Sequence, residues 1–216
     1  TSESVALEFP MLSLYASTIS GNTAQWGGGG IFSEGDITLF GSTVSGNSTA
    51  HDGGGIFGCE RTGALTLANS TISGNTASQW GGGIGIYHSR GNITIANSTV
   101  ASNSAGGAWY GGGITLRNAY LSATTLIDNT IISGNLVGTN ANSKLASVVV
   151  GYFGGTTSPM PIAGVGNLVY QGTAALTPAT SGVNFVNTPI TANPLLAALA
   201  DNGGPTRTML PQTGSP

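Results

Sequence analysis

The stretch that decides the fold is residues 70–103, which reads STISGNTASQWGGGIGIYHSRGNITIANSTVASN. It opens and closes with related six-residue motifs, each of which ends in an asparagine. Between them lie a glycine-rich segment that leads into Ile84 and an alternating segment, Ile93-Thr94-Ile95. The stretch therefore contains three kinds of short segment in a fixed order: the motif that ends in asparagine, the glycine-rich segment and the alternating segment.

The same order recurs over most of the chain. Copies of the first motif end at asparagines spaced 25, 28, 28 and 32 residues apart: Asn22, Asn47, Asn75, Asn103 and Asn135. Glycines lead into a second set, Ile31, Ile56, Ile84 and Ile114, and the alternating segments occupy residues 12–14, 37–39, 65–67 and 93–95. A fixed period of this length indicates a repeat protein whose units bury their apolar faces against one another.

Within each segment the apolar residues alternate with polar ones, which is the period of a β-strand. No segment has helical periodicity long enough for a crossover helix, whereas leucine-rich repeats usually need one and propeller blades need antiparallel hairpins. The chain is therefore predicted to be all-β. We expect a right-handed parallel β-helix with three short strands per coil and about 25–32 residues per coil.

Alternation also predicts which side chains point into the coil. On the first strand these are Ile19, Val44, Ile72, Val100 and Ile131. On the second they are Ile31, Ile56, Ile84 and Ile114, and on the third Leu14, Leu39, Leu67 and Ile95.

The recurring asparagines are predicted to form a structural ladder at a turn. A carboxamide both donates and accepts hydrogen bonds, so stacked copies can bond to one another and to the turn backbone. The glycines before them, at positions 21, 46, 74 and 134, are expected to adopt positive φ. We divide the chain into a partial first coil or cap (1–16), regular coils (17–135), and irregular final coils with a C-terminal capping region (136–216).

Composition excludes several functions. The chain has five Lys and Arg among 216 residues and a net charge of −3, so it lacks the positive footprint of a nucleic-acid partner. No apolar run reaches the ~18 residues of a membrane-spanning helix. A single cysteine, Cys59, excludes an internal disulfide and a cysteine metal cluster. We predict no cofactor and no metal site.

The alternation of STISGN-type motifs with Gly-Gly-Gly-Ile resembles the repeats of bacterial surface β-helix proteins, including the polymorphic outer-membrane protein type. Residues 193–206, NPLLAALADNGGPT, together with the ending 210–216, resemble the closing segment of many such exported proteins. In that family the segment commonly continues into an Ala-Ile-Asp stretch, so the resemblance implies a fragment or a longer tail. It also implies a secreted or cell-surface location.

Two clusters could carry function. The first is an aromatic edge four or five residues before the second-segment isoleucines, and its candidate ligand-binding residues are Trp26, His51, Asp52, Trp80, Trp109 and Tyr110. Stacked flat rings would suit a polysaccharide. They could also simply cover the neighbouring glycine backbone.

The second cluster is a charged column three to six residues after those isoleucines, namely Glu34, Asp36, Glu60, Arg61, His88, Arg90 and Arg117. Such groups could act as acid and base in sugar cleavage, or could lie in solvated turns as weak ion pairs. No strand carries the clustered aspartates that paired-carboxylate hydrolysis requires.

We therefore expect a non-catalytic extracellular or cell-surface module, adhesin-like or structural, which contacts carbohydrate or associates end to end into filaments. The alternative is a polysaccharide lyase or glycoside hydrolase that uses the charged column.

Overall fold

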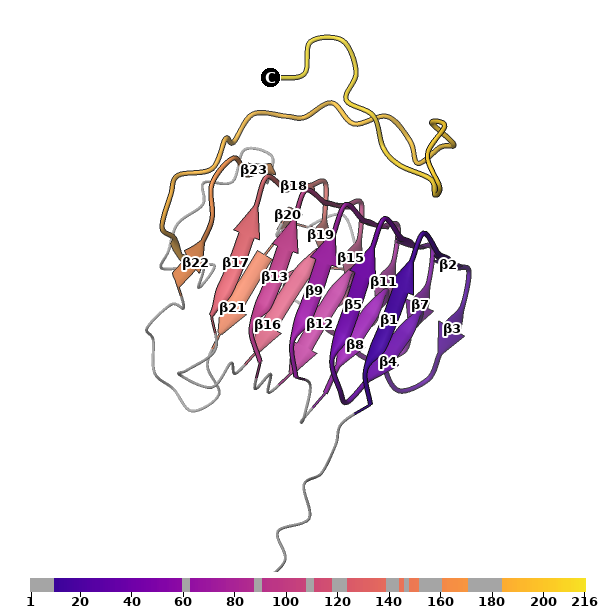
Figure 1. Ribbon diagram of the computed structural model, residues 1–216. Helices are drawn as coiled ribbons and strands as arrows, with labels where there is room; N and C mark the ends of the chain where they lie inside the picture. The colour runs from indigo at the N-terminus through magenta and orange to yellow at the C-terminus, as the bar shows by residue number, and fades with distance from the viewer. Residues whose placement is uncertain are drawn as a thin grey trace, which may run out of the picture.

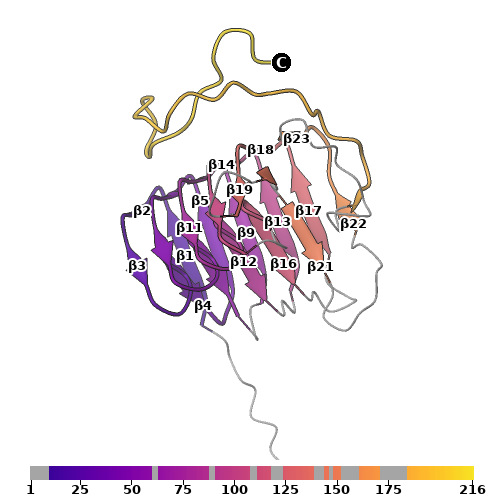
Figure 2. The same ribbon diagram turned by 180° about the vertical axis from the view of Figure 1, so that it is seen from behind.

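A computed structural model describes residues 10–59, 63–87, 91–107, 111–117, 124–138, 144–145, 148–151, 161–170 and 184–216. The described chain is all-strand and winds as a parallel β-helix (Figure 1). The coils stack in chain order, from β1–β4 at one end to β22–β24 at the other (Figures 1 and 2). Four coils repeat one order of strands, β1–β4, β5–β8, β9–β12 and β13–β16.

The strands stack into four sheets, which we number I to IV in the order the chain meets them. Sheet I contains β1 (Leu12–Tyr15), β5 (Ile37–Phe40), β9 (Leu65–Ala68), β13 (Ile93–Ala96), β17 (Thr125–Asp128), β22 (Pro161–Ala163) and β24 (Asn184–Phe185). Sheet II contains β2 (Thr18–Ser20), β6 (Thr43–Ser45), β10 (Thr71–Ser73), β14 (Thr99–Ala101), β18 (Ile131–Ser133) and β23 (Leu168–Tyr170).

Sheet III contains β3 (Thr23–Ala24), β7 (Ser48–Thr49), β11 (Thr76–Ala77), β15 (Ser104–Ala105), β19 (Leu136–Val137) and β20 (Lys144–Leu145). Sheet IV contains β4 (Ile31–Ser33), β8 (Ile56–Gly58), β12 (Ile84–Tyr87), β16 (Ile114–Arg117) and β21 (Val148–Gly151). All strand pairs are parallel except β19 with β20, among the pairs in the described part of the chain.

The predicted three strands per coil correspond to sheets I, II and IV. Sheet III adds a fourth strand of only two residues directly after each ladder asparagine, as in Thr76–Ala77 after Asn75. This strand is too short to show alternation, which is why the sequence pattern did not separate it from the turn.

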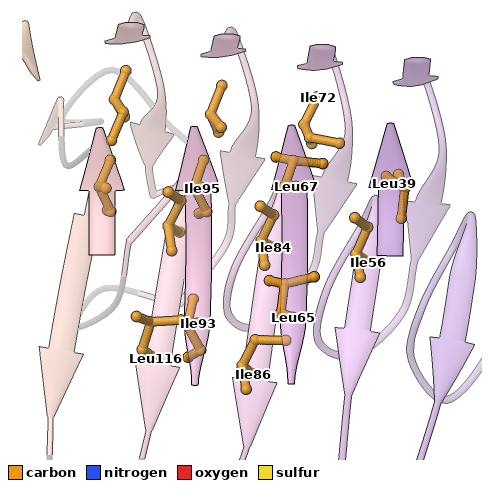
Figure 3. Packing of buried hydrophobic residues seen from close by; sticks show 14 of the residues in the cluster. Leu39, Ile56, Leu65, Leu67, Ile72, Ile84, Ile86, Ile93, Ile95 and Leu116 are labelled. Atoms are coloured by element: carbon orange, nitrogen blue, oxygen red, sulfur yellow. The ribbon is translucent and has the colours of Figure 1, made fainter. Parts of the chain in front are cut away.

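The core is a stack of like side chains on like (Figure 3). Leu39, Leu67 and Ile95 lie above one another in register, and each is fully buried. On sheet IV, Ile56, Ile84 and Ile114 also lie above one another in register and are fully buried. Stacking of this kind buries each coil's apolar face on its neighbours, and each such side chain contributes about 1.5–3 kcal/mol.

One predicted core position is wrong by a single residue. Val100 pairs with Ile132, which is fully buried, whereas Ile131 pairs with Thr99 on the outer face and is half-buried. The fifth motif holds two consecutive isoleucines, so hydrophobicity alone does not choose between them. Counting back from Asn135 gives the correct register, because β-strand alternation sends neighbouring residues to opposite faces.

The ladder asparagines are linked from coil to coil by two hydrogen bonds each. The backbone N–H and the side-chain Nδ2 of Asn75 both donate to Oδ1 of Asn103, each at 3.0 Å. Nδ2 of Asn75 also donates to the carbonyl of Val44 on the preceding coil, at 3.0 Å. The same pattern runs from Asn22 to Asn135, and all members except Asn22 are buried. Buried carboxamides are thus satisfied by their own copies.

A second ladder, of hydroxyl groups, holds the corner between sheets I and II. The N–H of Ser42 donates to Oγ of Ser70, and the N–H of Ser70 donates to Oγ of Ser98, at 3.1 and 3.2 Å. Each hydroxyl in turn donates to the carbonyl two residues before it, as Ser70 does to Ala68. The ladder contains Ser17, Ser42, Ser70, Ser98 and Thr130, and it ends on the side chain of Asn167.

Both corners need a left-handed residue. The predicted positive φ is present at all four glycines before the ladder asparagines, with φ of 62° at Gly46 and 63° at Gly74. In the fourth coil this place is taken by Ser102, whose φ is 58°. At the hydroxyl corner, Asn69 and Asn97 adopt φ of 51° and 49°, so their role is to form this turn.

The last part of the chain does two things. Residues 184–190 add a final rung: β24 pairs with β22, and Ile190 bridges Leu168. The chain then runs back along the outside of sheet II towards the first coils (Figures 1 and 2). Within this returning segment, residues 195–212 form a hairpin in which Ala200 and Thr208 exchange backbone hydrogen bonds.

Candidate functional site

The aromatic edge lies in the loop that joins sheet III to sheet IV. The bridge between Gly27 and Asp52 sets the register, so that Trp26 lies beside His51. Their rings stack, with centroids 5.4 Å apart and planes 28° from parallel. Nδ1 of His51 is 3.2 Å from Nε2 of Gln79 on the next coil. Trp26, His51 and Gln79 therefore form one column, which we call the Trp26 column.

Trp26 is the most exposed large apolar side chain of the described residues, at 81 %. One side of the indole is held by the imidazole of His51, which is half-buried and fixed by Gln79. A supported ring with this much open surface can accept the flat apolar face of a ligand. The sequence did not single out Gln79, because nothing but its register with His51 marks it.

Trp80 does not continue this column. The backbone N–H of Trp80 donates to Oδ1 of Asp52 at 3.1 Å, so Asp52 serves to hold the loop of the next coil. The indole lies parallel to Tyr87, at 5.9 Å and 6°, and is half-buried. The two tryptophans are one residue out of register, and the straight row of rings expected from the sequence is interrupted. Trp109 and Tyr110 lie outside the described residues.

Glycines beside the aromatic edge allow the loop to lie close to sheet IV. A Cβ on Gly27 would stand 2.6 Å from the ring of Phe57, which projects from the outer face of this sheet. Phe57 in turn contacts Phe32, with centroids 5.9 Å apart, and Phe32 is 52 % exposed. The edge thus includes two phenylalanines that the sequence analysis did not assign to it.

Of the charged column, the structure describes the side chains of Glu34 and Asp36, both of which are exposed. Oδ1 of Asp36 accepts the N–H of Ala64 on the next coil at 2.8 Å. Asn92, two coils further on, accepts the N–H of Thr124 in the same way at 3.0 Å. The side chains of Asp36 and Asn92 thus accept the same backbone hydrogen bond in different coils. Because an amide can replace the carboxylate there, we interpret Asp36 as a turn residue.

Arg117 ends β16, where its backbone pairs with Tyr87 and Gly151. The remaining charged candidates, Glu60, Arg61, His88 and Arg90, lie outside the described residues. Within the described ranges, no group of three or more His, Cys, Asp and Glu side chains could hold a metal ion. The same part of the chain contains no helix long and apolar enough to cross a membrane.

Comparison with known proteins agrees with the fold. The family model described as the right-handed β-helix region matches residues 11–131, more than half of the chain. The protein therefore belongs to the right-handed β-helix family, and the predicted handedness is that of the family. No curated protein and no solved structure matches the chain.

Proposed function

We propose that this chain is a non-catalytic β-helix module of an extracellular or cell-surface protein, adhesin-like in role, which contacts polysaccharide through the Trp26 column. The observation that carries the proposal is the 81 % exposure of Trp26 on a ring-stacked support. The same edge carries Phe32, which is 52 % exposed and contacts Phe57 next to Gly27, and neighbouring exposed rings on a rigid scaffold favour an interaction site. The sequence resemblance to exported bacterial proteins supports the location.

A sugar is the partner that suits this surface best. An indole face packs against the axial C–H groups of a pyranose ring, and the binding free energy comes from apolar area at ~25 cal/mol per Å² before the costs of association. The carboxylate of Asp52, whose backbone bridges Gly27 next to Trp26, and the net charge of −3 disfavour a strongly anionic polymer. We therefore expect neutral polysaccharides to bind better than polyuronates.

The chemistry of the described residues favours binding over catalysis. Asp36, the candidate acid whose contacts are described, is held by a backbone N–H at a turn. A catalytic pair for glycoside hydrolysis needs two carboxyl groups facing each other across the scissile bond. No strand of this sequence carries such a pair.

The test is a depletion assay on insoluble neutral and anionic polysaccharides, with parallel measurement of new reducing ends and unsaturated products. We expect retention on a neutral polymer, no product, and loss of retention in Trp26→Ala. Phe40→Ala is the matched control, because Phe40 is also exposed, at 49 %, but lies on sheet I beside Tyr15. Product formation that disappears in Glu60→Gln or His88→Ala would replace the proposal with the enzyme alternative.

End-to-end association is a second candidate, favoured by the first coil. Its inward residues Leu12, Leu14 and Ile19 are only half-buried, whereas their counterparts in the next coil, including Leu39 and Val44, are fully buried. A second copy that stacked on this coil would bury them. Electron microscopy of the purified chain at high concentration tests this. Filaments would support end-to-end association, and a field that contains single particles alone would contradict it.

A further inference from the structure

We propose that residues 191–216 are a strap that closes the β-helix laterally, and that Thr43 and Arg207 form its latch. The strap leaves the last coil at Ile190, whose N–H donates to Asn167 and whose carbonyl accepts the N–H of Val169. Its hairpin tip reaches the second coil. Hence one segment joins the two ends of the described stack.

Two hydrogen bonds fix the tip to the second coil. The hydroxyl of Thr43 donates to the carbonyl of Arg207 at 2.7 Å, and the hydroxyl of Thr206 donates to the carbonyl of Gly41 at 3.1 Å. These contacts span 164 and 165 residues. The tip is shaped for this task by Asn202, whose Nδ2 donates to the carbonyl and hydroxyl of Thr208.

Burial on the outer face of sheet II follows the path of the strap. Thr43 points outward yet is fully buried, and Thr71 and Ser73 on the next strand are also buried. Thr18 holds the same position as Thr43 on the first strand and is exposed. On the first four strands of this sheet the outward side chains are all Thr, Ser or Ala, whereas Ile131, Leu168 and Tyr170 take these positions on the last two strands. A face of small side chains lets a strap lie close.

The consequence concerns how the stack opens. In a solenoid each coil contacts only its neighbours, so its ends fray independently. A strap from the last coil to the second adds one long-range contact, so that weakening the last coil also weakens the second coil. The strap therefore makes the stack a more cooperative unit.

The rate of trypsin cleavage after Arg207 reports on the latch. The carbonyl that accepts the hydrogen bond of Thr43 belongs to the peptide bond that trypsin would cut. In the intact 216-residue chain we expect this bond to resist trypsin, and mass spectrometry follows the release of residues 208–216. Thr43→Val removes the hydrogen bond and should speed cleavage about two- to tenfold, since cleavage follows the open population. Thr43→Trp, which fills the space beneath the strap, should speed it more than about tenfold.

Thr18→Trp is the matched control, because it places the same ring at the equivalent exposed position; we expect its cleavage rate to stay within about twofold of wild type. Equal cleavage in Thr43→Trp, Thr18→Trp and wild type would overturn the latch. A concentration-dependent dimer with Arg207 protected would overturn closure within one chain.

Coupling between the ends is tested by hydrogen exchange. Val169 is fully buried in the last coil, and Val169→Ala should raise amide exchange in residues 43–45 about two- to tenfold. In the Thr43→Trp background the same substitution should leave exchange in that strand unchanged. An equal effect in both backgrounds would show that coupling passes through the coils and would overturn the proposal.

Discussion

The side-chain Nδ2 of Asn75 lies 3.0 Å from the position that a Cβ atom on Gly55 would occupy. Asn47 has the same relationship to Gly30 at 2.9 Å, and Asn103 to Gly83 at 2.9 Å. The asparagine of each coil therefore occupies space left by a glycine of the coil before it. The two sequence signatures of the repeat, the terminal asparagine and the glycine run, depend on each other because they share this space.

Gly55→Ala should destabilise the protein by about 3 kcal/mol, because the new methyl group meets Gly83 O at 2.6 Å and Asn75 Nδ2 at 3.0 Å. Chemical denaturation measures the loss. Gly204→Ala is the control, since its Cβ would meet only Thr206 O at 3.6 Å, and should change stability by less than about 0.5 kcal/mol. Equal effects of the two substitutions would contradict the shared-space account.

Asn75→Ala should cost about 1–3 kcal/mol, because it leaves the N–H of Asn47 and the carbonyl of Val44 without their partner in a buried corner. Asn22→Ala, in the exposed first rung, should cost clearly less. Unfolding by urea or heat compares the two. Unchanged stability in Asn75→Ala would show that the ladder bonds contribute nothing.

The repeat made the coil, its parallel stacking and most of the core predictable. Position within each motif fixes the register, so Ile56 above Ile84 follows from counting residues. Ile131 was placed wrongly because two adjacent isoleucines satisfy the hydrophobic pattern equally. The hydroxyl ladder was also missed, although the first residue of every motif is Ser or Thr, because serine at a turn has many explanations.

Ser102→Gly should stabilise the protein by about 1 kcal/mol. Ser102 has φ of 58° where other coils use glycine, and its side chain is exposed, so glycine relieves backbone strain without loss of packing. Ser104→Gly, in β15, should have the opposite sign because it adds flexibility within a strand. The difference in melting temperature checks both signs; a lower melting temperature in Ser102→Gly would refute the strain argument.

Thr125→Val should also stabilise the protein, by about 1 kcal/mol. Thr125 takes an inward place in sheet I that Ile93 and Ile162 hold on the adjoining strands, and its buried hydroxyl has no hydrogen-bond partner. Valine keeps the shape and removes the cost of the unpaired group. Thr66→Val, half-buried on the outer face of the same sheet, should be near neutral. Loss of stability in Thr125→Val would indicate a hidden hydrogen bond.

The candidate site was less predictable than the fold. Spacing from the isoleucines placed Trp26 and His51 side by side, since both precede their isoleucine by five residues. It did not separate Trp80, which is one residue out of register, and it gave no reason to expect the ring of Tyr87 beneath it. Side-chain direction in a loop depends on contacts from neighbouring coils, which a linear pattern does not contain.

The most direct test of the functional account is a fluorescence titration at Trp26 itself. We compare the wild-type protein with Trp26→Phe while adding the neutral oligosaccharide whose polymer retains the protein. Sugar packed on the exposed indole removes water from it, so the account predicts a saturable blue shift in the wild type and none in Trp26→Phe, at unchanged melting temperature. A shift that persists in Trp26→Phe, or no shift with any neutral oligosaccharide, would contradict the Trp26 column as the binding surface.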